Sequence, residues 1–430
     1  MLTSSIPEAC GSWAAMKAAY RFFDSDNVKV RDIQESFFAS TLDRIRGEET
    51  VLVAQDTTSL DFTRHKGTKG LGYLDNLLCQ GIKMHSGLAI SVAGVPIGLI
   101  DQKFLVRKRE EAGKRGRRKK KKTEEKESQR WLTTAENIQR RIGELRSGKG
   151  KTKKVVIVSD RESDIFDLFA QGRGEGYELL IRGAHNRRVS GEAKHLFDKM
   201  LVEAVAGEID FSVRRARERK GRNVHAEIRF CEVEIHPPGY RAKEKLEPIR
   251  LNCILVKEKE ASDEVSPIEW LLLTTMEVKT IEDALQYVKW YSLRWLIERY
   301  HYVLKSGCQI EELQLEEEER IERATAVYCV VAWRLLFITY LARKDPDKSS
   351  SGVMEQHEWE AMYCFTHKTT SPPSSAPSLS ELVRQIAKLG GFIGRNGDGD
   401  PGVKVLWRGI RHLPDISGMY QIFRKDMGNA

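Results

Sequence analysis

The sequence predicts an α/β fold, and three features carry this prediction. Residues 51–54 and 155–158 are short apolar runs followed by polar residues, a pattern typical of buried strands that end in loops. Residues 128–146 lie between these runs and predict a helix. A later helix is expected over residues 291–305, because nothing in that run breaks a helix. In folds of this class, ligands bind at the carboxyl ends of the strands.

The predicted elements divide most of the chain into four parts. Residues 1–45 are expected to be helical, and residues 46–190 to form the first part of the α/β core. Residues 191–265 alternate between apolar and polar side chains and predict strands. Residues 266–345 then return to the core. Within the core, strands are expected near residues 50–55, 85–92, 96–105 and 154–159.

The remaining residues predict a linker and a small helical unit. Two Ser/Pro-rich stretches, residues 349–352 and 369–378, indicate a linker over residues 346–378. Residues 379–430 are expected to be mostly helical. One face of this unit carries Leu382, Ile386 and Leu389.

Composition indicates a soluble protein of the bacterial cytoplasm. The chain has 430 residues, enough for a large core, and 31% of them are charged. The longest apolar stretch, residues 324–342, contains Arg334 and predicts a buried helix, so no membrane partner is expected. The amino terminus lacks the basic start and apolar run of a signal peptide. Seven scattered cysteines without CxxC spacing favour reduced thiols.

Positive charge is concentrated in one segment. Residues 107–122 contain eleven Lys or Arg and two Glu, which sum to +9, the formal net charge of the whole chain. Such a segment offers phosphates a salt-sensitive contact without sequence preference. A solvated surface segment without a partner is the alternative. A second basic cluster, residues 214–222, is expected at the tip of a hairpin and is a further candidate for DNA contact.

Three acidic residues are candidates for one site. Asp56 and Asp160 end the two predicted buried strands, and Glu298 lies on the helix expected over residues 291–305. Three carboxylates without nearby His or Cys favour Mg²⁺ or Mn²⁺ over Zn²⁺. Two such ions can promote phosphoryl displacement. Taken singly, each Asp is also explained as a turn former, and Asp160 as the cap of a helix near Ser163.

Four residues on the later helix share one face. Relative to Tyr291, the offsets of Arg294, Glu298 and Lys305 are 3, 7 and 14. At about 100° per residue, these offsets place all four side chains within a stripe about 60° wide. This combination could hold a metal ion beside a phosphodiester. An exposed helix face with an Arg294–Glu298 pair is the alternative.

These residues resemble a known family. The runs QDTTSL around Asp56 and VSDRESDIF around Asp160, with the Tyr-x2-Arg-x3-Glu-x6-Lys signature, resemble insertion-sequence-4 family bacterial DDE transposases of the transposon-5 type. The resemblance extends over nearly the whole chain and includes YRFFDSDNV, EKESQRWL, WLLLT and AKLGGFIGR. It implies a ribonuclease-H-like catalytic core with a β-rich insertion, a helical amino-terminal unit for DNA end recognition and a helical carboxyl-terminal dimerisation unit.

The resemblance also implies a function and its residues. The enzyme would cleave DNA at transposon ends and join the released 3′-hydroxyl to target DNA, using Mg²⁺, for which Mn²⁺ can substitute, in a site for two ions. Its partners would be both DNAs and a second copy of the chain, associated with the nucleoid. The implied catalytic and metal-binding residues are Asp56, Asp160 and Glu298. The implied DNA contacts are Tyr291, Arg294, Lys305, Arg182 and Trp270, the last of which would stack on a flipped base.

Several alternatives stay open. From the residues alone, Trp270 is better explained as a core aromatic and Arg182 as an ordinary strand-end charge. Relatives have a longer amino-terminal domain, so residues 1–45 are expected to be its remnant. A truncated, non-catalytic inhibitor that forms unproductive dimers with a complete transposase is therefore a second hypothesis. A general ribonuclease-H-like nuclease is a third, but it does not account for Trp270 or the helix face around Tyr291.

Overall fold

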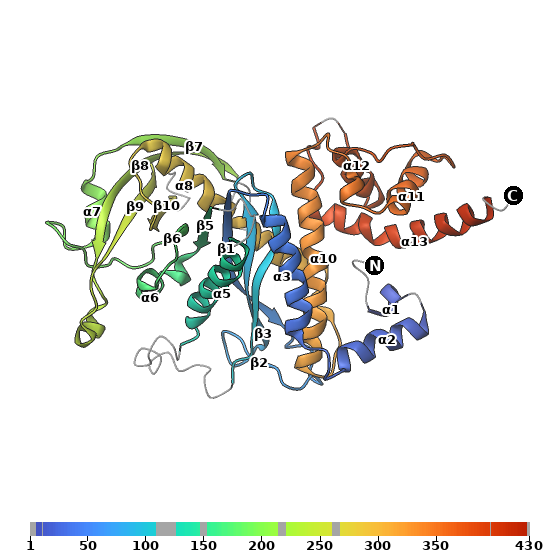
Figure 1. Cartoon of the computed structure of the whole chain (residues 1–430), viewed down its shortest axis with the longest axis horizontal. Coiled ribbons are helices and arrows are strands. Elements are labelled where there is room, and N and C mark those ends of the chain that lie inside the picture. Colours follow the sequence, from blue (N-terminus) through green and yellow to red (C-terminus); the bar gives the residue numbers. More distant parts are fainter. Residues whose placement is uncertain are drawn as a thin grey trace.

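One mixed β-sheet lies at the centre of the computed structural model, and helices cover both of its faces (Figure 1). The structure describes residues 6–10, 12–108, 126–146, 153–213, 221–259, 267–395 and 397–427. The strands in these residues are β1 Thr50–Asp61, β2 Gly72–Tyr73, β3 Gln80–Ser91, β4 Pro96–Leu105, β5 Lys154–Ser159, β6 Tyr177–Arg182, β7 Gly207–Val213, β8 Arg222–Ile235, β9 Ile249–Glu258 and β10 Glu269–Thr274. Their order is β2-β3-β1-β5-β6-β10-β9-β8-β7, and β4 also pairs with β3.

Helices occupy both ends of the chain and the crossovers of the core. The helices are α1 Ile6–Cys10, α2 Trp13–Asp24, α3 Val30–Ile45, α5 Gln129–Arg146, α6 Phe166–Ala170, α7 Leu196–Val202, α8 Ile281–Leu293, α9 Trp295–Tyr302, α10 Glu318–Lys344, α11 Gln356–His367, α12 Leu379–Leu389 and α13 Val403–Met427. Residues 6–45 are therefore mainly helical where they are described, as expected.

The central strands are buried on both faces, which explains their unbroken apolar sequences. In β1, Leu52 and Ala54 belong to one buried cluster, whereas Val51 and Val53 belong to the other. Successive side chains of a strand point to opposite faces, so a strand covered on both sides is apolar at every position. The first cluster includes residues of α8, α9 and α10, and the second includes residues of α5, α6 and α7.

The connectivity of the core confirms the ribonuclease-H-like prediction. Strands β4, β3 and β1 are antiparallel neighbours, and β5 and β6 then follow β1 in parallel. This arrangement brings the carboxyl ends of β1, β5 and β6 to one edge of the sheet.

The β-rich residues before β10 extend the same sheet. Strands β7, β8 and β9 form antiparallel pairs, and β9 joins β10, with Leu255 opposite Leu271. Strand β10 in turn pairs with β6 of the core, where Leu272 lies opposite Arg182. The inserted strands are thus continuous with the catalytic sheet, and they form the end of the molecule opposite to α11–α13 (Figure 1).

Helix α10 separates the sheet from the carboxyl-terminal helices (Figure 1). It is long and apolar enough to cross a membrane by length and composition alone, and 67% of its most apolar window is buried inside the protein. Trp333 packs on Phe37 of α3 and donates its indole N–H to the carbonyl of Pro96 at 2.9 Å. The prediction of a buried helix is confirmed. All seven cysteines lie in the described residues and are free thiols.

The stretch expected to be a linker contains a helix. Helix α11 lies between the two Ser/Pro-rich stretches and packs on α12 and α13. A capping box between Glu355 and Glu358 starts it. In α12, Leu382 and Ile386 are fully buried, as the sequence predicts.

Candidate active site

Asp56 and Asp160 lie on neighbouring parallel strands at the same level of the sheet. Gln55 and Ser159 form the last pair in the parallel register of β1 and β5, and each acid is the next residue. Burial raises the pKa of Asp160, and the negative charge of Asp56 raises it further. The two carboxylates are therefore close enough to repel each other.

The surroundings of the two acids differ in part from the sequence-based expectation. Asp56 does not end its strand: β1 continues to Asp61, because its pairing with β3 runs on past Asp56, which lies opposite Ser86. Asp160 does end β5, and its carboxylate caps the short 3-10 helix Arg161–Ser163 by accepting a hydrogen bond from the amide of Glu162 at 2.9 Å. The capping explanation is therefore confirmed for Asp160, and its role in a catalytic site stays a prediction.

Residues 291–305 are helical throughout, but they do not form one regular helix. Arg294 joins α8 to α9, and the segment Val303–Gly307 is a π-helical turn. The wider turn displaces Lys305 from the predicted stripe. Its ammonium group donates to the carbonyl of Ser59 at 2.8 Å and lies 3.0 Å from the carboxylate of Glu311. In the described part of the chain, the partners of Lys305 are thus Ser59 and Glu311, and not Glu298.

Arg294 and Glu298 form an ion pair next to Tyr291. The guanidinium group donates to the Glu298 carboxylate and lies 6.0 Å from the centre of the Tyr291 ring. The side chain of Glu298 is 45% exposed, as the alternative explanation predicts, whereas that of Arg294 is only 14% exposed. Burial disfavours its charge, but Tyr291, Glu298 and Asp56 together raise the pKa of Arg294 above its ordinary value. Arg294 thus links the helix to the acids of the sheet.

Trp270 and Arg182 also lie close to Tyr291. The Trp270 ring is centred 5.5 Å from that of Tyr291 and 5.7 Å from that of Phe211. The Trp270 side chain is partly buried against the core, so one part of it is a core aromatic, as the alternative explanation predicts. Arg182 donates to the carbonyl of Glu269 at 3.0 Å, and burial lowers its pKa while Tyr291 acts in the opposite direction.

His301 is a site residue that sequence analysis missed. Its Nδ1 lies 3.4 Å from Oδ2 of Asp56, and its side chain is 7% exposed. Among the described residues, its Nε2 has no hydrogen-bond partner. The statement that the acids lack a nearby histidine is therefore wrong, because the fold brings α9 against β1. The spacing of three residues from Glu298 places both side chains on one side of a helix and was the available signal.

A network of polar side chains joins the segments that carry Asp56 and Asp160. The hydroxyl of Thr57 lies 2.8 Å from Nδ1 of His85 and accepts a hydrogen bond from Arg130 at 2.9 Å. Arg130 also donates to Glu162 at 2.8 Å, which connects α5 to the turn that Asp160 caps. Burial lowers the pKa of His85 well below its ordinary value, and the charge of Arg130 contributes. His85 is therefore a neutral imidazole that joins β3 to β1.

The oxygen donors fit a hard divalent cation only in part. Asp56 and Asp160 present adjacent carboxylates, which suit Mg²⁺ or Mn²⁺. Glu298 is held by Arg294 instead, and in the described part of the chain no three His, Cys, Asp or Glu side chains are grouped as metal ligands. A cation at the two aspartates would relieve their repulsion, which is the observation that favours such a site.

Family models account for nearly the whole chain. A model of the transposase DDE domain matches residues 66–333, more than half of the sequence. The chain belongs to the DDE transposases. A transposase DNA-binding model matches residues 1–28, and a transposase Tn5 dimerisation model matches residues 330–420. The chain is therefore a DDE transposase of the Tn5 type, which acts in DNA transposition and has DNA-binding and dimerisation elements. The match of the DDE domain includes Asp160 and Glu298 and begins after Asp56.

The two basic clusters of this transposase lie mostly outside the described residues. Of residues 107–122, the structure describes Arg107 and Lys108, and Arg107 is ion-paired with Glu127. Of residues 214–222, it describes Gly221 and Arg222, and Arg222 is ion-paired with Glu258. These two arginines are thus occupied within the protein.

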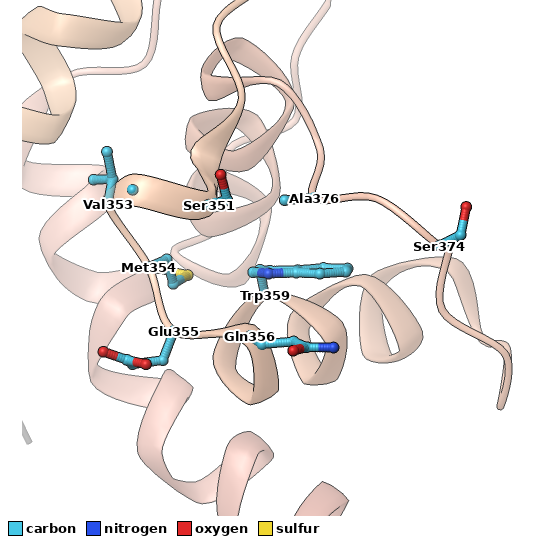
Figure 2. Close-up of a pocket in the computed structure, with 9 residues that line it drawn as sticks. Ser351, Val353, Met354, Glu355, Gln356, Trp359, Ser374 and Ala376 are labelled. Carbon is cyan, nitrogen blue, oxygen red and sulfur yellow. The ribbon is translucent and has the colours of Figure 1, made fainter.

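A hollow of about 510 Å³ lies within the residues matched by the dimerisation model. Figure 2 shows the ring of Trp359 with Met354 beside it, Gln356 below it and Ala376 above it. Trp359 is buried and anchors α11 in the helical unit. The hollow is lined by residues in and around α11, which lies across α10 from β1 and β5 (Figure 1), so it is separate from the candidate active site.

Proposed function

We propose that this transposase cleaves DNA at the ends of its element and joins the freed 3′ end to target DNA, in cut-and-paste transposition. The observation that carries the proposal is the placement of Asp56 and Asp160 at the ends of the pairing between adjacent parallel strands. His301 contacts Asp56 and lies on the same helix as Glu298, so this contact joins the helix of the third acid to the strand of the first.

We infer that Asp56 and Asp160 would hold a divalent cation, Mg²⁺ or Mn²⁺, and that Glu298 would complete a second site. DDE transposases generally use divalent ions. Such ions activate a water or hydroxyl and stabilise the leaving oxygen in phosphoryl displacement. Glu298 must exchange its bond with Arg294 to serve as a ligand. The freed guanidinium group could then bind the phosphate that reacts, because Arg bonds phosphate with two parallel N–H groups.

The aromatic and basic side chains near Glu298 would position the DNA. Tyr291, Arg294 and Arg182 lie together and offer phosphate donors next to the acids. Trp270 would receive an unstacked base, an interaction worth about 1–3 kcal/mol. Lys305 lies apart from this group, and its proposed contact with DNA requires that it leave Glu311.

A second copy of the chain and two kinds of DNA would be the partners, in the cytoplasm and on the nucleoid. The proposed dimer contact is the exposed apolar face of α13, because Met419, Ile422 and Phe423 are each more than half exposed. Their spacing of three and four residues places them on one side of the helix.

A strand-transfer assay tests the proposed function. Pre-cleaved ends of the element are incubated with target plasmid, Mg²⁺ and either the wild-type protein or Glu298→Gln. We expect joined products with the wild type alone. Equal joining by Glu298→Gln would show that the acid is misassigned. Joining by neither protein, with DNA binding intact, would favour the inhibitor hypothesis.

A further inference from the structure

A cavity of about 460 Å³ lies beside the candidate active site, on the face of the sheet that α5 and α6 cover. Its walls come from four segments: the start of α6, the loop after β6, the loop after β8 and the turn before α5. The first two segments follow the strands that carry Asp160 and Arg182. Helix α9, with Glu298, packs on the opposite face. The cavity and the helix therefore flank the two aspartates from different sides.

The loop after β6 is held in a fixed shape by one buried carboxylate. Asp164 accepts hydrogen bonds from the amides of Ala184 and His185 at 2.7 and 2.9 Å, and Arg187 donates to it at 2.5 Å. Both partners of this ion pair are buried. The loop therefore presents the neighbouring Arg188 to solvent from a rigid base.

The cavity carries free positive charge. The acids in its lining are neutralised, Asp164 by Arg187 and Asp167 by Arg241. Lys126 and Arg188 also line it, and within the described residues neither has an acidic side chain at ion-pair distance. Arg241 is shared between Asp167 and Glu244, so the local sum is about +1, and the two cations Lys126 and Arg188 attract phosphate.

An exposed aromatic ring stands at the same cavity. Tyr240 is 73% exposed, and the ammonium group of Lys126 lies 5.6 Å from the centre of its ring. Exposed aromatic rings next to basic groups are the common way in which proteins hold unpaired nucleotides, with the base on the ring and the phosphate on the cation. The volume lies within the range of about 300–1,000 Å³ of small-ligand sites, so one nucleotide fits.

We propose that this cavity is a second DNA subsite, which holds the backbone of DNA that passes the aspartates on the α5–α6 side. Lys126 and Arg188 bind phosphate, and Tyr240 packs on a base or sugar. This inference rests on the proposed function, because it assumes that DNA lies at Asp56 and Asp160. The DNA is either the end of the element or the target, which share this chemistry.

Salt-dependent binding tests the subsite. The affinity of the full chain for an element-end duplex and for an unrelated duplex, each with a single-stranded overhang, is measured over a range of salt concentrations, without divalent ions. The variants are Lys126→Ala/Arg188→Ala and Tyr240→Ala, and Lys243→Ala is the matched control. Lys243 is exposed in the same turn as Tyr240 and does not line the cavity. Because Arg188 and Tyr240 are exposed, folded variants are expected, and their thermal unfolding midpoints verify this.

We expect the double variant to reduce the slope of log affinity against log salt by about 1–2, since each phosphate contact in duplex DNA contributes about 0.9. Tyr240→Ala should weaken binding roughly 5- to 150-fold without changing the slope, as loss of stacking does. A change on the element-end duplex alone identifies the end as the occupant, and a change on the unrelated duplex identifies target DNA. Lys243→Ala should bind both duplexes as the wild type does. If the double variant and Tyr240→Ala also kept the wild-type affinity and salt slope on both duplexes, the proposed subsite would be wrong. If the wild type binds neither duplex, the proposed function itself fails.

Discussion

His301 Nδ1 lies 3.4 Å from Oδ2 of Asp56, so the helix that carries Glu298 is fixed to the strand that carries the first aspartate. Histidines that orient a ligating carboxylate are positioning residues, and their loss typically lowers activity about 10- to 100-fold. We expect His301→Ala to lower the single-turnover rate of DNA cleavage by this factor.

The conservative variant separates positioning from general stability. His301→Asn keeps an N–H donor near Asp56 and should recover part of the rate, whereas both variants should bind the element end as the wild type does. A wild-type cleavage rate for His301→Ala would show that the contact has no role in the reaction.

The repulsion between Asp56 and Asp160 predicts a stability response to divalent ions. The native state holds the Asp160 proton more tightly than the unfolded chain does, so stability falls as pH rises above the ordinary pKa of the carboxyl. At neutral pH and without divalent ions, Asp160→Asn should therefore unfold at a higher temperature than the wild type.

With Mg²⁺ or Mn²⁺ present, the wild type should instead unfold at a higher temperature than Asp160→Asn. An ion at one hundred times its dissociation constant stabilises the native state by about 2.7 kcal/mol. We expect the unfolding temperature of the wild type and of the control Glu282→Gln to rise with Mn²⁺, and that of Asp56→Asn/Asp160→Asn to stay constant. An equal rise in the double variant would place the ion elsewhere. Differential scanning calorimetry measures all four proteins.

Trp270 is expected to contribute to DNA binding through stacking. Trp270→Ala should weaken binding of the element end by about 1–3 kcal/mol, and Trp270→Phe should retain most of the affinity. The control is Phe211→Leu, which removes the ring that packs on Trp270 and leaves the indole in place. Fluorescence anisotropy measures the affinities. If Trp270→Ala bound the element end with wild-type affinity, Trp270 would have no role in DNA binding and would be a core residue only.

Because of His85, we expect the free energy of unfolding to fall as the pH falls. Its pKa in the native state lies well below the ordinary 6.5, mainly because it is buried. Below pH 6.5 the unfolded chain binds a proton that the native state does not, so stability is lost as pH falls, by up to about 1.4 kcal/mol per pH unit. His85→Asn should show a shallower loss between pH 6.5 and 5. Urea unfolding at several pH values checks this, and identical slopes for both proteins would contradict it.

The sequence predicts the parts of this site whose cause is local. The apolar runs before Asp56 and Asp160 form strands because both faces of the sheet are covered. The run after Tyr291 is helical as expected, although it is interrupted at Arg294 and ends in a π-helical turn.

What the sequence did not predict depends on contacts between distant segments. Lys305 leaves the predicted stripe because Ser59 and Glu311 hold it at a π-helical turn. His301 faces Asp56 only because the fold brings together residues far apart in the chain. Helix α11 was also missed, because the prediction of a linker rested on the two Ser/Pro-rich stretches alone, whereas a Glu355–Glu358 capping box starts a helix between them.

The central claim is that Asp56, Asp160 and Glu298 act together on one phosphodiester. The most direct measurement compares cleavage of element-end DNA in Mg²⁺ with DNA affinity for Asp56→Asn, Asp160→Asn and Glu298→Gln, and for the exposed control Glu282→Gln. We predict that each of the three variants loses cleavage by at least about 10³-fold, because positioned charge supplies most of the rate. All four should bind DNA within about twofold of the wild type, and the control should cleave normally. Substantial cleavage by any one of the three acid variants would contradict the account.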